Sequence, residues 1–227
     1  MNYSFKTISK KVMGDLHTPV SIYLKVRDIY PESALLESSD FHGNENSLSF
    51  IALRPLASIG INNGECTATF PDETREVTPL TEDYNVPEAM NAFLGRFKVE
   101  LKEFLAGFRV DGDGSELCGV FGYTAFDAVR YFENIPVMEV HHEENDAPDM
   151  LYILYKYILV FNHFKNELTL VEMLQEDEAS RLEEIETLIE NRNFASYNFQ
   201  TAGPETSPIT GEEYKAMVRQ GIKHCLR

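Results

Sequence analysis

The sequence predicts an α+β fold, in which an antiparallel β-sheet or one layer of a β-sandwich has flanking helices on one side. Two observations favour this class. Regions 47–70 and 150–173 either alternate small polar with large apolar residues or are rich in β-branched and aromatic ones, which is typical of strands. Elsewhere, apolar residues recur at three- and four-residue steps, which is typical of helices. With 43% hydrophobic residues among 227, the chain can also bury a core.

Charge and cysteine content exclude several classes of protein. The formal net charge is −17, so the chain would repel the phosphates of nucleic acids and anionic membrane surfaces. The sequence has no run of about 18 apolar residues to span a membrane, and its first residues lack a signal-peptide pattern. Its three cysteines are widely spaced without a CxxC pair. They fit free thiols in the cytoplasm better than disulfides or a zinc site.

The first 31 residues predict a strand and then a helix. Residues 6–15 mix polar and apolar side chains and are expected to open the sheet. Thr18 is a suitable N-cap, and Pro19 suits the first helical position because its missing N–H costs nothing there. The helix is expected to end at Tyr30, because a residue before proline avoids helical angles.

Residues 34–39 and 47–52 predict two strands joined by a polar loop over 40–46. The first strand ends in Glu37 and Ser38, which places a carboxylate and a hydroxyl at the edge of the sheet. Such a pair could hold the amine and the carboxylate of an amino acid, so this edge predicts half of a pocket. An ordinary hairpin with solvated polar ends has the same pattern and stays open as the alternative.

Residues 47–70 predict a β-meander that is interrupted at Arg54-Pro55. The segment Asn62-Asn63-Gly64 predicts a tight hairpin, because Asn and Gly tolerate positive φ. Residues 72–85 are polar and predict a loop.

The most regular helical stripe follows Pro87 and predicts one helix that ends near Gly107. A stripe this regular indicates core packing rather than a binding site; its members are Met90, Phe93, Leu94, Phe97, Leu101, Phe104 and Leu105. The run 111–114 begins like a calcium loop. Its twelfth position is Gly122, where a bidentate Glu is needed, so the run predicts a turn.

Residues 118–123 predict a buried strand whose glycines allow another backbone to come close. Asp127 is expected to cap a helix over 128–134. The segment 141–144 contains two His and two Glu, but it lacks the His-x-x-x-His spacing of a helical metal pair. It therefore predicts a solvated loop.

The C-terminal third predicts a hairpin, a helix, a linker and a further helix. Residues 150–161 and 167–173 predict paired strands around a turn, and 176–191 predict an amphipathic helix with a Glu-rich outer face. Thr210 and Glu213 have capping-box spacing and are expected to start the last helix. A natural chain rarely ends on an amphipathic helix that has just begun after a linker, so truncation at the C-terminus is expected.

Four segments together resemble the N-terminal region of anthranilate synthase component I, a chorismate-utilising enzyme. They are 18–25, Leu35-Leu36-Glu37-Ser38, the pair 119–123 and 126–133, and 148–150 leading to 160–163. The resemblance implies three parts: a tryptophan-regulatory region over 1–200, a linker over 201–209, and the start of a chorismate-binding region over 210–227. Two departures look structural, namely Asn162 where the family usually has Asp and Phe126 where it usually has Tyr.

The resemblance further implies that the edge at Glu37 and Ser38 lines a feedback-inhibition site for L-tryptophan. The implied ligand-binding residues are Ser38, Glu37, Leu36, Phe50 and Ser49, with Leu48 assigned less directly. The whole lyase would convert chorismate and ammonia to anthranilate and pyruvate, with Mg²⁺ as cofactor and a glutamine amidotransferase subunit as partner. No residue in 1–227 matches the family's catalytic or Mg²⁺-binding positions, so this part alone is expected to be inactive.

Two other interpretations stay open. The chain could be part of aminodeoxychorismate (para-aminobenzoate) synthase component I, where the same pocket usually holds a non-regulatory tryptophan. It could also be a stand-alone amino-acid-binding module, which its length and composition permit. The Leu-Leu-Glu-Ser segment favours the anthranilate branch, and the expected truncation argues against the module.

Overall fold

The computed structural model describes residues 2–38, 47–81, 84–100, 119–133, 147–191, 198 and 200–226. The chain divides into two compact units, Met1–Phe194 and Ala195–Arg227. The strands are β1 (Tyr3–Met13), β2 (Ala34–Leu36), β3 (Leu48–Asn62), β4 (Glu65–Thr69), β5 (Arg75–Pro79), β6 (Phe97–Glu100), β7 (Phe121–Thr124), β8 (Met150–Asn162) and β9 (Glu167–Leu174). The helices are α1 (Pro19–Val26), α2 (Val86–Leu94), the 3-10 helix η3 (Phe126–Tyr131), α3 (Leu182–Glu190) and α4 (Gly211–Cys225).

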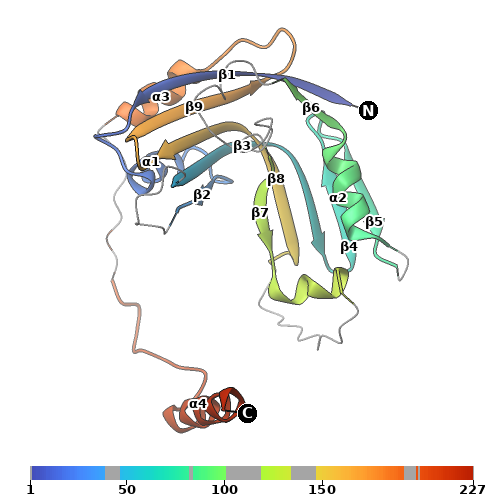
Figure 1. The fold of residues 1–227 in the computed structure, drawn as a ribbon, viewed down its shortest axis with the longest axis vertical. Helices are drawn as coiled ribbons and strands as arrows, with labels where there is room; N and C mark the ends of the chain where they lie inside the picture. Colours follow the sequence, from blue (N-terminus) through green and yellow to red (C-terminus); the bar gives the residue numbers. More distant parts are fainter. Residues whose placement is uncertain are drawn as a thin grey trace. The chain divides into compact units, whose positions relative to one another are not determined.

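The nine described strands form a single sheet in the first unit (Figure 1). Its main path runs β5-β4-β3-β8-β9-β1-β6, while β2 pairs with β3 and β7 pairs with β8. The pairs are antiparallel except β1 and β6, which are parallel. The α+β class is therefore confirmed, but the sheet is mixed rather than purely antiparallel. The reason is that residues 97–100 return beside the first strand in the same direction.

A bulge bends the two longest strands of the sheet, β3 and β8. Their register shifts between Pro55 and Ala57, and Arg54 has a φ of 60° beside the shift. An extra residue on one strand bends it and increases its twist, and both strands curve through this region in Figure 1. The interruption expected at Arg54-Pro55 is thus a bulge within one continuous strand.

The helices pack against this bent sheet through two cores. On β8, Tyr157 and Leu159 belong to the core that also contains residues of α1 and α3, whereas Met150 and Leu154 belong to the core that contains residues of α2. Odd- and even-numbered residues of a regular strand point to opposite faces, but the consecutive residues Lys156 and Tyr157 both interact with Glu172, so the alternation along β8 is interrupted between these two groups. Phe50 and Tyr155 both contact Phe121 on the other face. These contacts do not place the helices on opposite faces, and the expectation of helices on one side stays a prediction.

The helix expected to follow Pro87 ends at Leu94, and β6 begins three residues later. The prediction of one long helix is wrong because two tertiary interactions outweigh the helical spacing. The backbone of β6 pairs with β1, and the ring of Phe97 lies 5.7 Å from the ring of Tyr3. The remainder of the predicted stripe and the turn at 111–114 lie within 101–118, outside the described residues.

Three other expectations need correction. The loop expected over 72–85 contains β5, which pairs with β4 at the outer edge of the sheet. Its polar side chains face water there, and for that reason the sequence pattern predicted a loop and not a strand. The strand β7 is mostly exposed rather than buried, because it pairs with one end of β8 only. The helix expected over 128–134 is the short η3, which begins after Ala125 without a side-chain cap from Asp127.

Local signals are confirmed at two helix starts and one hairpin. The side chain of Thr18 accepts the N–H of Ser21 at the start of α1, and Thr210 accepts the N–H of Glu213 at the start of α4. The hairpin at 62–64 turns through positive φ at Asn63 and Gly64, at 49° and 75°. The paired strands predicted around residues 162–166 are confirmed as β8 and β9.

Two helices differ from the expected bounds. Helix α1 ends at Val26 and passes into a turn, in which the Tyr30 N–H bonds the Val26 carbonyl oxygen at 2.8 Å. Helix α3 begins at Leu182 rather than 176. The residues just before it use their side chains in an ionic cluster that is described below. The segment 141–144 lies outside the described residues.

The second unit contains α4. The apolar side chains on this helix are exposed; they are Tyr214, Met217, Val218 and Ile222. Within the described residues of this unit no hydrophobic side chain is buried, and α4 is stabilised locally by its capping box and by pairs such as Lys215 with Glu212 at 2.8 Å.

Candidate functional site

The candidate site begins where β2 pairs with the first half of β3. Leu36 lies directly opposite Phe50, and Leu35 lies opposite Ile51. Opposed residues share a face of the sheet. Leu35 and Ile51 pack into the core under α1 and α3, whereas Leu36 is 40% exposed and Phe50 is half-buried on the other face.

A hydrogen-bonded network holds the end of β2 in place. The backbone N–H of Ser38 donates to the Ser49 hydroxyl oxygen at 3.0 Å, and the Ser47 hydroxyl donates to the Ser38 hydroxyl oxygen at 3.2 Å. The Ser49 hydroxyl oxygen also lies 2.7 Å from the ring atom Nε2 of His163. The backbone N–H of His163 donates to the Ser47 carbonyl oxygen at 3.1 Å. The turn after β8 therefore joins, through His163, the network that contains Ser38, Ser47 and Ser49.

The face of the sheet that carries Leu36 and Phe50 continues from β3 across β8. Aromatic and aliphatic side chains line it there. The Phe50 ring lies 5.8 Å from the Phe121 ring, which in turn lies 6.4 Å from the Tyr155 ring. Phe50 and Phe121 pack on the buried Ile158 and Val160. The result is an apolar surface on the face that carries Leu36 and Phe50.

The structure brings together most of the residues predicted for the pocket. Leu36, Phe50 and Leu48 share one face, with Ser38 at its end. Glu37 is exposed beside them. Ser49 is different, because it is 0% exposed and its hydroxyl is used within the network.

Sequence reasoning did not assign His163, Ser47 or Phe121 to the pocket. His163 and Phe121 come from separate parts of the chain, and the pairing of β8 with β3 and with β7 brings them to this region of the sheet. The pattern Ser47-Leu48-Ser49 could have indicated Ser47 as a pocket residue, because Ser47 directly follows the predicted loop. No comparable sequence pattern indicated Phe121.

A second polar cluster lies deeper in the first unit. Lys156 is 2% exposed and contacts the Glu178 carboxylate, and its Nζ lies 3.7 Å from Oε1 of the fully buried Glu172. The other oxygen of Glu172 accepts the Ser180 hydroxyl at 2.8 Å and the Arg181 N–H at 3.0 Å. Glu172 thus holds the start of α3, where a negative charge is favourable.

This cluster also perturbs ionisation nearby. Burial, followed by the negative charge of Glu172, raises the pKa of Tyr157 to about 12. Burial alone would raise the pKa of Glu178, but hydrogen bonds from Lys156 and from the Gln175 N–H lower it overall. The charges are paired inside the protein, and the cluster has a structural role.

Metal ligands do not gather in the part of the chain that the structure describes. Within it, no three His, Cys, Asp or Glu side chains are placed to hold an ion together. The described residues therefore do not fit a magnesium site. Among the described helices, none is both long and apolar enough to cross a membrane.

Comparison with known proteins assigns the family. Residues 35–227, from β2 through α4, match the family model described as chorismate binding enzyme. The chain belongs to the chorismate binding enzyme family. The matched range includes the Ser38 network and the Phe50–Phe121 surface, so the candidate site lies within the chorismate binding enzyme match.

Curated relatives in this family carry one name. The chain is 32% identical over 163 residues to anthranilate synthase component 1 of Thermus thermophilus, covering 71% of this chain and 31% of that protein. It is 26% identical over 164 residues to the protein of that name from Lactococcus lactis, and 26% identical over 232 residues to that of Pseudomonas putida. The last comparison covers 96% of this chain and 44% of the relative. The chain thus spans about a third of the length of the first relatives.

Proposed function

We propose that this chain is the N-terminal part of an anthranilate synthase component I. The whole enzyme would convert chorismate and ammonia, or glutamine, to anthranilate and pyruvate for tryptophan synthesis. The observation that carries the proposal is the match to the chorismate binding enzyme family over 35–227, together with relatives named anthranilate synthase component 1. The ammonia would come from a glutamine amidotransferase subunit.

Within that enzyme, this chain would supply half of a feedback-inhibition pocket for L-tryptophan. The Leu36–Phe50–Phe121 surface offers an apolar wall for the indole. The exposed Glu37 carboxylate would pair with the ammonium group, and the Ser38 hydroxyl would bond the carboxylate. Ser47, Ser49 and His163 would act through Ser38 by holding the strand end in place.

Catalysis would require residues outside 1–227. The resemblance implies that Mg²⁺ would be held elsewhere in the whole enzyme, since no residue in 1–227 matches the family's Mg²⁺-binding positions. The 227-residue chain alone is expected to produce no anthranilate from chorismate.

The proposal is tested with the whole gene product that contains this chain, given chorismate and an ammonium salt. Anthranilate is expected and is detected by its fluorescence. Accumulation of aminodeoxychorismate instead would assign the chain to the para-aminobenzoate branch. A whole protein that binds amino acids but does not consume chorismate would support a stand-alone binding module and overturn the proposal.

The pocket is tested separately with Ser38→Ala in the whole protein. Loss of a hydrogen bond to a charged group should raise the tryptophan concentration for half-inhibition by about tenfold or more. The turnover number should stay within about twofold, because the pocket is regulatory. Ser9→Ala, an exposed position on β1, is the matched control and should leave inhibition unchanged. Unaltered inhibition in Ser38→Ala would disprove the site assignment.

A further inference from the structure

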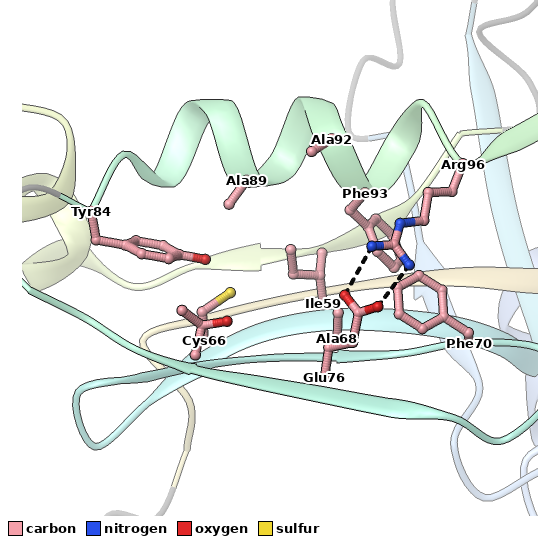
Figure 2. Close-up of a pocket in the computed structure, with 11 residues that line it drawn as sticks. Ile59, Cys66, Ala68, Phe70, Glu76, Tyr84, Ala89, Ala92, Phe93 and Arg96 are labelled. Atoms are coloured by element: carbon pink, nitrogen blue, oxygen red, sulfur yellow. Dashed lines mark hydrogen bonds and ion pairs between the residues drawn. The ribbon is translucent and has the colours of Figure 1, made fainter. Parts of the chain in front are cut away.

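A small cavity lies between α2 and the sheet formed by β3, β4 and β5, and none of its lining residues belongs to the candidate site. Its volume is about 160 Å³. Figure 2 shows Ala89 and Ala92 on the helix above it, and Cys66 and Ala68 on the strands below. These small side chains leave the space open.

Aromatic packing at one end of α2 keeps the cavity from closing. The Phe93 ring lies 5.8 Å from the Phe70 ring, which stacks at 5.8 Å on Tyr3. Phe70 and Phe93 are both buried, as is Val86 near the other end of the helix. Large side chains at both ends thus hold α2 away from the sheet, while alanines face the gap between them.

Two polar groups meet at one end of the cavity. The Tyr84 hydroxyl points inward toward the side chain of the buried Cys66 (Figure 2). Burial, followed by the hydrogen bond with Cys66, raises the pKa of Tyr84 to about 12. Tyr84 is therefore neutral near pH 7 and can donate or accept a hydrogen bond inside the cavity.

An ion pair closes the other end. Arg96 donates two hydrogen bonds to the Glu76 carboxylate, at 2.8 and 3.0 Å, and its guanidinium lies 4.6 Å from the centre of the Phe70 ring. Both side chains are partly exposed, so this pair forms the rim of the cavity. Because each charge is already paired, a charged ligand would have to displace one partner. The cavity therefore favours a neutral ligand.

Size and chemistry together define the ligand class. A cavity of about 150 Å³ lined by apolar side chains accommodates benzene. The walls here combine alanine, isoleucine and phenylalanine side chains with the polar side chains of Thr78, Tyr84, Glu76 and Arg96. We propose that this cavity binds a small uncharged aromatic molecule, with one six-membered ring and one hydrogen-bonding substituent placed against the Tyr84 hydroxyl. The ring would contact Phe70, Phe93 and the alanine methyl groups. The proposal does not depend on the function proposed above.

The experiment titrates the 227-residue chain with phenol and follows ¹H–¹⁵N spectra. Saturable shifts are expected at residues around Cys66, Tyr84 and Ala89. Benzoate, the charged analogue, is expected to produce none of them, because the rim charges are paired. Absence of saturable shifts with phenol, or tighter binding of benzoate, would overturn the proposal.

Three variants locate the ligand. Ala89→Leu fills the cavity and should weaken phenol binding more than tenfold, whereas Ala216→Leu on α4 is the matched control and should not. Tyr84→Phe should weaken phenol binding about fivefold and leave benzene binding unchanged, as expected for one neutral hydrogen bond. Ala92→Leu, nearer the rim, replaces Ala89→Leu if the latter does not unfold cooperatively. Undiminished phenol binding in a folded cavity-filling variant would also overturn the proposal.

Discussion

The hydroxyl oxygen of Ser49 lies 2.7 Å from Nε2 of His163, although 114 positions separate the two residues. The same oxygen accepts the N–H of Ser38 at 3.0 Å. One buried hydroxyl therefore connects the turn after β8 with the end of β2. The position of Ser38 depends on this connection.

Replacing Ser49 with alanine should destabilise the first unit by about 1–3 kcal/mol, because the partly buried Ser38 N–H and His163 Nε2 would each lose a hydrogen-bond partner. Urea unfolding followed by circular dichroism measures the change. Ser9→Ala, on the exposed side of β1, should change stability by less than about 0.5 kcal/mol. Equal stabilities of the two variants would show that the Ser49 hydroxyl holds nothing in place.

Replacing Lys156 with methionine should cost about 3–5 kcal/mol, because it leaves the charge of Glu172 buried without its cation. The comparison is Lys10→Met, which removes the more exposed Lys10–Glu186 pair and should destabilise the protein much less. Chemical unfolding of both variants provides the measurement. A Lys156→Met protein as stable as the wild type would mean that the core tolerates Glu172 without its cation.

Replacing Gly122 with alanine should detach β7 from β8. A Cβ on Gly122 would lie 1.8 Å from the Leu151 carbonyl oxygen and 2.7 Å from Cα of Tyr152, and backbone atoms cannot move aside as a flexible side chain can. Hydrogen exchange should accelerate at the amides of 121–124. Gly221→Ala, which meets no atom within 4 Å, should leave the first unit unaffected. Unchanged protection of β7 in Gly122→Ala would contradict the predicted collision.

Acid should weaken the cluster at Glu178. The folded-state pKa of Glu178 is lower than that of an ordinary glutamate, since hydrogen bonds from Lys156 and the Gln175 N–H outweigh the effect of burial. A lowered carboxyl pKa contributes stability above the unfolded-state value of about 4.3, and this contribution is lost as the pH falls through the folded pKa. Glu178→Gln should therefore be less stable than the wild type at pH 7, with the difference shrinking below about pH 4. A difference that stays constant from pH 7 to pH 3 would exclude this ionisation as the cause.

Much of the local structure follows from the sequence because neighbouring residues determine it. Thr18 and Thr210 cap helices with their own side chains, and Asn63-Gly64 tolerates the positive φ of a hairpin. The close approach of a backbone at Gly122 was also predicted from the glycine alone. The apolar pair Leu36 and Phe50 follows from two strands joined by a short polar loop.

Tertiary structure decided the features that depend on distant partners. Residues 97–100 have helical spacing, yet they form β6, because β1 offers backbone partners and Tyr3 an aromatic contact. His163 and Phe121 join the candidate site only through the antiparallel pairing of β8 with β3 and β7. The bulge at Pro55 shifts the register of β3 against β8 between the halves of the strand that pack in the two cores. The sequence by itself determined the α+β class, the turns and the caps, since these depend on a few adjacent residues. The order of the strands and the network that links Ser38 through Ser49 to His163 depend on contacts between residues more than a hundred positions apart. Only the folded chain brings such residues together.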